Sequence, residues 1–410
     1  MLDTFKLAAQ MPAIAEYLQQ QAQANRDRLD AVLRHYERAS ANPSRWQERQ
    51  PPDFKQLAFN AATPIEPLTF RGEATATTTP HSVVATDGSQ ITPNHHEVAY
   101  CSLINIGRVA IHYGVSRQPL LDSVPQVFFR ADEFDRDRPP GVGLETVLGL
   151  RRDRAEADEL ARLAVEMQSE SGEAIALTDG ALIHWGVESF PRTWQERWVE
   201  PMVASFDRLR AARIPVVGYV SASRSSEAVN FLRLGLCPFE SCNCREFCAD
   251  TRMSAAPCSP LMKSARRKPT SGKSGARPGG VGDRLMWSAL LQEGQRSPLW
   301  CSQLDQMKLY GDHRIHFCYL HVGSEIARLE MPAWVATDAE LLARSLGTVL
   351  AQVQRGMGYP IALAEAHHLA VVKGGDRQRF FALLDRQLQQ AGLPGYSISR
   401  KEANKRRGIA

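Results

Sequence analysis

The sequence lacks the features that define several large protein classes. No stretch approaches the roughly 20 consecutive apolar residues that a membrane-spanning helix needs. Cysteine is scarce, with 8 in 410 residues, which argues against a disulfide-stabilised scaffold. The first residues contain neither a basic segment nor an unbroken apolar one, so we expect no secretory signal, no membrane association and a cytoplasmic location.

A large excess of charge is also missing. The chain has 49 basic and 45 acidic residues, and the net charge of +4 is too small to indicate nucleic-acid binding by itself. However, residues 263–277 hold six basic and no acidic side chains, and residues 396–410 hold five basic and one acidic. Subtracting both segments leaves about −6 for the rest, so the sequence predicts an acidic body with a basic insert and a basic tail.

The remaining composition, 43% hydrophobic and 23% charged, is that of an ordinary globular protein. Apolar residues recur at helical spacing over much of the first 50 residues, and short apolar strands then alternate with amphipathic helices from residue 81. This alternation predicts an α/β fold with a sheet covered by helices on both faces. The expected strands are 83–86, 98–113 with a turn at 105–107, 175–178, 214–220, 315–320 and 326–329. The expected helices are 144–167, 194–212, 339–355, 361–371 and 377–390.

Two aspartates follow short apolar strands in matching contexts. Asp87 comes after Val83–Thr86 and Asp179 after Ile175–Thr178, and each precedes a glycine. We interpret them as strand-end carboxylates that could share a divalent cation, because Mg²⁺ and Mn²⁺ prefer oxygen ligands. The alternative is that both Asp-Gly pairs are simple turns.

Helix geometry suggests a third carboxylate. At roughly 100° per residue, Glu156 falls on the apolar face of the expected helix 144–167, whereas Glu159 lies about 60° away. An inward carboxylate is costly unless it is paired or bound to metal. Pairing of Glu156 with Arg152, one turn earlier, is the alternative explanation.

The segment from Gly358 to His368 supplies a fourth element. His367 follows Tyr359 by eight residues, roughly two helical turns, so the two side chains could reach one site. Histidine can bind metal or move protons, and the tyrosine hydroxyl can hold a phosphate or a water. The alternative is that His367 is a structural residue with its hydrogen bonds satisfied.

At this point the sequence resembles the NurA-domain nucleases. The resemblance rests on a collinear set of segments that covers roughly residues 80 to 407, and no single motif carries it. The segments are Asp87–Ser89, Thr178–Leu182, Gly218–Ser221, Gly323–Pro332, Tyr359–His367 and Ser399–Lys401, with Lys405 and Arg406 just beyond.

This resemblance implies an RNase H-like core, cleavage of DNA that depends on Mn²⁺ or Mg²⁺, and a homodimer. It also implies partnership with a HerA-type hexameric ATPase in processing the ends of DNA double-strand breaks. The family's active site consists of acidic residues with a tyrosine and a histidine. Motif by motif, these would be Asp87, Asp179, Tyr359 and His367, with Glu156 as the intervening glutamate and Glu159 as the second choice.

We therefore expect Asp87, Asp179, Glu156 and His367 to hold metal, so that bound cations activate water and stabilise the charge on the scissile phosphate. Lys401, Lys405 and Arg406 would contact the DNA backbone without reading its sequence. The expected organisation is a helical arm over 1–60 and one nuclease domain over 75–410, interrupted by a Cys-rich and basic insert at about 237–282.

The Cys-rich insert departs from what the family core needs. Cys237, Cys242, Cys244 and Cys248 have the spacing C-x4-C-x-C-x3-C, which is not a standard zinc pattern. We expect reduced loop cysteines; the alternative is a structural Zn²⁺ site, in which Cys258 could replace one ligand.

Two other functions stay open at this stage. One is a catalytically weak adaptor that docks a DNA translocase through its N-terminal helices. The other is a metal-dependent phosphoesterase for small substrates, which the basic tail disfavours.

Overall fold

The computed structural model describes residues 3–92, 101–130, 137–171, 173–248, 258 and 281–392. Its contacts divide the chain into two compact units, each assembled from two segments. The first unit consists of Met1–Thr75 and Val220–Ala336, and the second of Ala76–Tyr219 and Thr337–Ala410. Within the described ranges, no helix combines the length and the apolar character needed to cross a membrane.

The second unit contains a mixed sheet with the strand order β7-β6-β3-β4-β5. The strands β3, β4 and β5 are antiparallel neighbours, whereas β3, β6 and β7 run parallel. Their bounds are β3 (His81–Ile91), β4 (Ser102–Tyr113), β5 (Leu120–Phe128), β6 (Ala174–Asp179) and β7 (Val216–Val220). The α/β class and the mixed sheet flanked by helices are thus confirmed, whereas the RNase H-like core stays a prediction.

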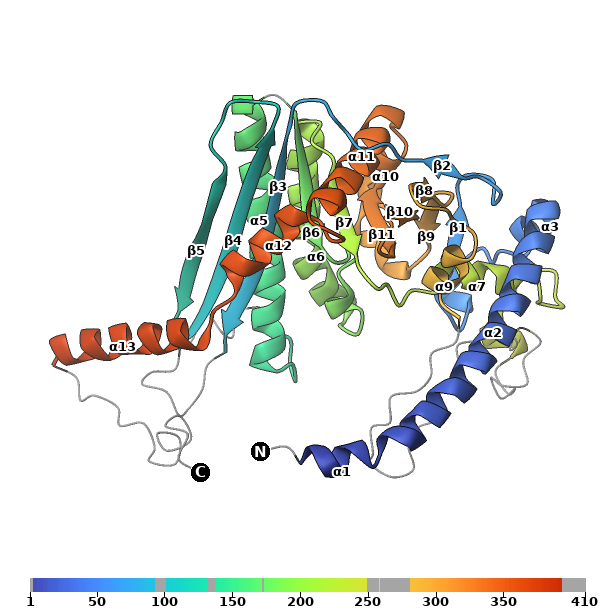
Figure 1. The fold of residues 1–410 in the computed structure, drawn as a ribbon, viewed down its shortest axis with the longest axis horizontal. Helices are drawn as coiled ribbons and strands as arrows, with labels where there is room; N and C mark the ends of the chain where they lie inside the picture. The colour runs from blue at the N-terminus through green and yellow to red at the C-terminus, as the bar shows by residue number, and fades with distance from the viewer. Residues whose placement is uncertain are drawn as a thin grey trace. The chain divides into compact units, whose positions relative to one another are not determined.

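Helices cover both faces of this sheet, as Figure 1 shows. The hydroxyl of Thr86 on β3 donates to the backbone of α5 at Glu156, whereas the next residue, Asp87, bonds to α12 at His367. Because successive strand residues point to opposite faces, α5 and α12 lie on opposite sides of β3. The helices of this unit are α5 (Leu144–Ser171), α6 (Arg192–Ala211), α11 (Ala339–Arg355), α12 (Ile361–Ala370) and α13 (Gly374–Gln390).

Two predicted chain breaks are wrong. Asp87-Gly88-Ser89 does not end a strand, because β3 continues to Ile91, and Asn105-Ile106-Gly107 is not a turn, because it lies inside β4. The two segments are paired with each other across the sheet. In both, residues typical of turns are present because a helix approaches the strand closely: Gly88 faces Glu156 of α5 and Gly107 faces the backbone of α12.

The first unit is built on short antiparallel strands. The helix predicted within the first 50 residues is present, and its C-terminal half packs Val32, Tyr36 and Ala39 into the core. The strands are β1 (Ala62–Pro64), β2 (Gly72–Glu73), β8 (Gln295–Arg296), β9 (Trp300–Ser302), β10 (Ile315–His321) and β11 (Ile326–Pro332). The helices are α1 (Thr4–Ala8), α2 (Met11–Ala41), α3 (Pro43–Glu48), α7 (Glu227–Leu234), α8 (Cys244–Phe247), α9 (Asp283–Ser288) and α10 (Ala333–Ala336).

A buried ion network lies at the centre of the first unit. The guanidinium of Arg328 is 2.8 Å from Glu227 and 2.7 Å from Glu330, and all three side chains are almost fully buried. The nearby carboxylate of Asp283 accepts backbone hydrogen bonds from Ala228 and Val229 at the start of α7. Arg328 therefore compensates charges that have no access to water.

We expect Arg328→Leu to lower the free energy of unfolding by about 3–5 kcal/mol, because it leaves two buried carboxylates without their cation. Urea denaturation followed by circular dichroism measures the change. Arg192→Leu is the matched control, since it breaks an exposed Arg192–Glu196 pair of 3.1 Å and should cost only about 0.3–0.5 kcal/mol. Equal effects of the two substitutions would contradict this interpretation of the network.

Candidate functional site

The parallel pairing of β3 with β6 brings the two Asp-Gly segments to the same level of the sheet. Thr86 is the register partner of Thr178, so Asp87 and Asp179 follow side by side on neighbouring strands. At β6 the chain turns away directly after the carboxylate: Gly180 has φ +104°, a conformation that favours glycine, and its N–H donates to Tyr219 O at 2.9 Å. The carboxylates of Asp87 and Asp179 thus lie at the same level of two neighbouring strands.

Both oxygens of Asp87 have defined partners. One accepts a hydrogen bond of 2.8 Å from His367 Nδ1 on α12, and the other accepts a 2.8 Å bond from the N–H of Gly88. The imidazole of His367 is 61% exposed. Because Nδ1 faces the carboxylate, the second ring nitrogen, Nε2, is left for another proton or ligand.

Tyr359 is hydrogen-bonded to the second aspartate of this site, Asp179. Its hydroxyl donates to Asp179, which lowers the pKa of that carboxyl, although burial has the larger effect and raises it overall. The Tyr359 ring packs edge-on against Tyr219 of β7, with centroids 5.5 Å apart. Tyr359, just before α12, thus bonds to Asp179, and His367, on α12, bonds to Asp87.

Glu156 approaches from the opposite face of β3. Its Oε1 lies so close to Gly88 that a Cβ at this position would overlap with it. Burial, with repulsion from the neighbouring Asp153 and Asp87, raises the pKa of Glu156 to about 8 against the opposing effect of Arg152. A glycine in the middle of β3 therefore makes room for a third carboxylate.

The structure also contains the ion pair that offered an alternative explanation for Glu156. Arg152 Nε is 3.1 Å from Glu156 Oε1, and Arg152 Nη2 donates to Asp153 at 2.9 Å. Glu159, the second choice for the active-site glutamate, is instead paired with Arg108 at 2.9 Å and with Arg162 at 2.7 Å. The structure thus brings Asp87, Asp179, Tyr359 and His367 together, places Glu156 near Asp87 from the opposite face of β3, and leaves Glu159 in a separate ion network.

The position of α12 is fixed by contacts with the backbone of β3 and β4. Asn105 Nδ2 donates to Leu369 O at 3.1 Å and to Ala370 O at 2.9 Å, and the hydroxyl of Ser89 also donates to Ala370 O. Gly107 lies against the backbone of Ala366 and Ala370. These contacts hold the helix, and with it His367, against the strand that carries Asp87.

The chemistry of this donor set suits a hard divalent cation. Three carboxylates and an imidazole are the ligands that Mg²⁺ and Mn²⁺ accept, and the mutual repulsion of Asp87, Asp153 and Glu156 is the kind of interaction that a cation relieves. Among the described residues, no three His, Cys, Asp or Glu side chains are already arranged around one point as a ligand set.

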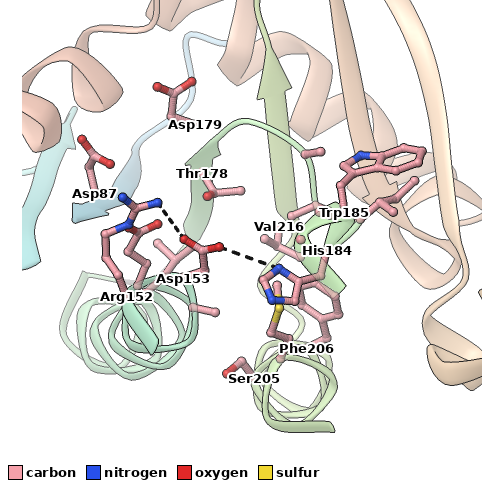
Figure 2. A pocket seen from close by; sticks show the side chains of 18 of the residues that line it. Asp87, Arg152, Asp153, Thr178, Asp179, His184, Trp185, Ser205, Phe206 and Val216 are labelled. Atoms are coloured by element: carbon pink, nitrogen blue, oxygen red, sulfur yellow. Dashed lines mark hydrogen bonds and ion pairs between the residues drawn. The ribbon is translucent and has the colours of Figure 1, made fainter. Parts of the chain in front are cut away.

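A cavity of about 330 Å³ adjoins the carboxylates and was not foreseen from the sequence. Asp87, Glu156 and Asp179 form part of its lining, together with Asp153 and His184 (Figure 2). Burial lowers the pKa of His184, whose Nδ1 is 3.8 Å from Asp153 Oδ2. The spacing of Asp153 and Glu156, three residues apart on one helix face, was the available signal.

The remaining predicted site residues do not join this centre. Lys401, Lys405 and Arg406, like the basic segment 263–277, lie outside the described residues. In the first unit, Cys237, Cys242, Cys244, Cys248 and Cys258 line one small cavity, and all five are free thiols. Reduced cysteines, with structural zinc as the alternative, stay the prediction here.

The fold and the site define an α/β protein with an acidic centre where two parallel strands meet. A family model described as the NurA domain matches residues 81–372. Because this match covers well over half of the chain, the protein belongs to the NurA-domain family. The resemblance inferred from the sequence motifs is thus confirmed.

The crystal structure of the NurA nuclease from Sulfolobus solfataricus aligns over 95% of this chain and 98% of that chain, with 11% sequence identity and a TM-score of 0.49. No curated protein matches the chain.

We expect Gly107→Ala to lower the free energy of unfolding by about 1–3 kcal/mol, because the new methyl group meets the backbone of α12, which cannot rotate away. Gly149→Ala, on α5, is the control: a Cβ there meets nothing within 4 Å, and replacing a helical glycine should stabilise the protein by about 0.5–1 kcal/mol. Chemical denaturation of both variants measures the difference. A Gly107→Ala protein as stable as the parent would show that α12 does not pack against β4 in this way.

Proposed function

We propose that this NurA-family protein is a metal-dependent DNA nuclease that hydrolyses phosphodiester bonds. The observation that carries the proposal is the pair of carboxylates, Asp87 and Asp179, held level on adjacent parallel strands with His367 bonded to the first and Tyr359 to the second. Membership in the NurA-domain family supports the same activity.

We assign Asp87, Asp179, Glu156 and His367 to the binding of Mn²⁺ or Mg²⁺. A divalent cation at these residues supplies positive charge at the scissile phosphate and lowers the pKa of a bound water. The three carboxylates come from β3, β6 and α5, so the ligands are carried by rigid elements.

The protein's own side chains have separate parts in this chemistry. Asp87 orients the imidazole of His367 through Nδ1, which leaves Nε2 to bind metal or to exchange a proton with the reacting group. Tyr359 fixes the orientation of the Asp179 carboxylate through its hydroxyl. Arg152 offsets part of the repulsion among Glu156, Asp153 and Asp87.

The wider role follows from the family. We propose that the protein processes the ends of DNA double-strand breaks in the cytoplasm, as a homodimer, together with a HerA-type hexameric ATPase. Contacts of Lys401, Lys405 and Arg406 with the DNA backbone belong to this proposal.

One observation favours the adaptor as a second candidate function. The first helices carry large apolar side chains that are 40% to 89% exposed, which suits a surface that another protein covers. These residues are Phe5, Leu7, Met11, Ile14, Tyr17 and Leu18. Such a surface is compatible with a nuclease that also docks a translocase.

We expect the purified protein to cleave linear DNA with Mn²⁺ or Mg²⁺ and to be inactive in EDTA. Asp87→Asn should reduce the cleavage rate by more than about 100-fold, the upper range for residues that only support a metal ligand. Gel assays with single-stranded DNA, double-stranded DNA and RNA measure the rate and the substrate class.

Asp158→Asn is the matched control, because Asp158 lies on α5 but pairs with Arg208 away from the site. It should leave the rate unchanged. If DNA stays intact with Mn²⁺ and also with Mg²⁺, the nuclease function is excluded and the adaptor function is favoured. If the Asp87→Asn protein cleaves DNA at the normal rate, the assignment of Asp87 to the active site is wrong.

We expect Gly88→Ala to abolish most cleavage while moving the melting temperature by only a few degrees. The new methyl group would meet Glu156 Oε1 and Arg152 Cγ, which are parts of flexible side chains that can swing aside. Gly374→Ala, where a Cβ meets nothing within 4 Å, is the control for a general effect of added bulk. A Gly88→Ala enzyme with full activity would remove Glu156 from the proposed ligand set.

A further inference from the structure

The cavity beside the carboxylates has the size and position of a substrate subsite. Its volume of about 330 Å³ lies within the range of small-molecule pockets. Asp87, Glu156 and Asp179 belong to its lining, so a phosphate bound to a cation at these carboxylates would lie beside the cavity. A group attached to that phosphate through one sugar can therefore reach inside.

The walls of the cavity are apolar on one side and polar on the other. Helix α6 contributes Met202, Phe206 and Leu209, which are at most 8% exposed. Trp185, at 40% exposure, stands at the side of the pocket in Figure 2. An exposed indole next to a buried apolar wall is a surface on which a flat ring can stack.

The polar side consists of Asp153 and His184. Figure 2 shows the two side chains directed toward each other, and Nδ1 of His184 is 3.8 Å from Oδ2 of Asp153. Arg152 donates to the other oxygen of Asp153 at 2.9 Å, which orients this carboxylate. A hydrogen-bond acceptor and an imidazole thus face the same space as the apolar wall.

The lining residues determine which kind of chemical group the cavity can bind. A phosphate is disfavoured, because Asp153 and Glu156 would repel a second anion. A flat ring with hydrogen-bonding groups on its edge satisfies both sides, and a nucleobase has this form. The base must be unpaired, because a base that enters the cavity has left the base opposite it.

We propose that this cavity binds one unpaired nucleobase of the strand being cut, stacked on Trp185, from the nucleotide next to the scissile phosphate. The inference rests on the proposed nuclease function and adds to it that the strand is single-stranded at the point of cleavage. Trp185 is then a residue that positions the substrate.

Two measurements test the base pocket in the full-length protein. The first is the affinity for a dye-labelled single-stranded oligonucleotide, compared with one of equal length that carries abasic sites throughout, by fluorescence anisotropy. The second is the cleavage pattern of single-stranded oligonucleotides in which one abasic site is moved stepwise along the chain.

We expect the fully abasic oligonucleotide to bind at least roughly tenfold more weakly, since base stacking on an aromatic side chain has about this effect. A single abasic site should suppress the cut at the adjacent phosphate. Trp185→Ala should bring the two affinities together, Trp185→Phe should restore most of the difference, and Trp194→Ala should leave it unchanged, because Trp194 on α6 is not in the lining.

The outcomes separate the two proposals. Cleavage of intact DNA with no effect of abasic sites, or an abasic effect that persists in a folded Trp185→Ala protein, overturns the pocket and leaves the nuclease standing. Base-dependent binding that requires Trp185, without cleavage, supports the pocket and excludes the nuclease. Equal binding of intact and abasic strands without cleavage excludes both.

Discussion

The packing of α12 against β3 and β4 is the interaction on which the site depends. A helix that crosses a sheet is normally held by side chains, which can repack when one of them changes. Here the contact is made by the backbone itself, at Gly107, and by amide and hydroxyl bonds from Asn105 and Ser89 to the last carbonyls of the helix. Such a contact permits little adjustment, and the distance between Asp87 and His367 is fixed as a result.

On the opposite face of β3, a glycine again lets a helix come close to the strand. Gly88 allows α5 to bring a carboxylate close to the strand, and Arg152 and Asp153 surround it on the same helix. Burying a carboxylate beside other negative charges is unfavourable, and the pKa of Glu156 is raised first by this burial and then by repulsion from Asp153 and Asp87. The folding free energy of the rest of the unit must offset this cost, as is common where side chains are arranged for chemistry.

Much of this arrangement was accessible from the sequence, and particular residues show where the reasoning stopped. Asp87 and Asp179 were found because each ends a short apolar run, and Glu156 because it interrupts an apolar helix face. The same residue types misled the prediction of local structure. Asp-Gly and Asn-Ile-Gly are typical of turns, and nothing local in the sequence distinguishes a turn from a strand that a helix from another part of the chain approaches closely.

The cavity and the buried ion network escaped prediction for the same reason. His184 and Asp153 meet only because β6 and α5 are neighbours, and Arg328 lies between carboxylates from α7 and β11. A charged residue in the middle of a strand looks like a solvent-facing position until its partners are known. Sequence patterns describe the surroundings of a residue along the chain, whereas these residues are defined by neighbours from elsewhere.

The alternation of the two units along the chain has a consequence for how the protein is made. Each unit needs two segments, and the second segment of each is synthesised only after part of the other unit. Synthesis must therefore reach residue 332 before the first unit has all of its strands, and residues beyond that point are needed to add α12 to the second unit. Neither unit can be obtained by shortening the gene from one end. During synthesis, all strands of the second unit's sheet are made before α12, so His367 joins Asp87 only in a late step of assembly.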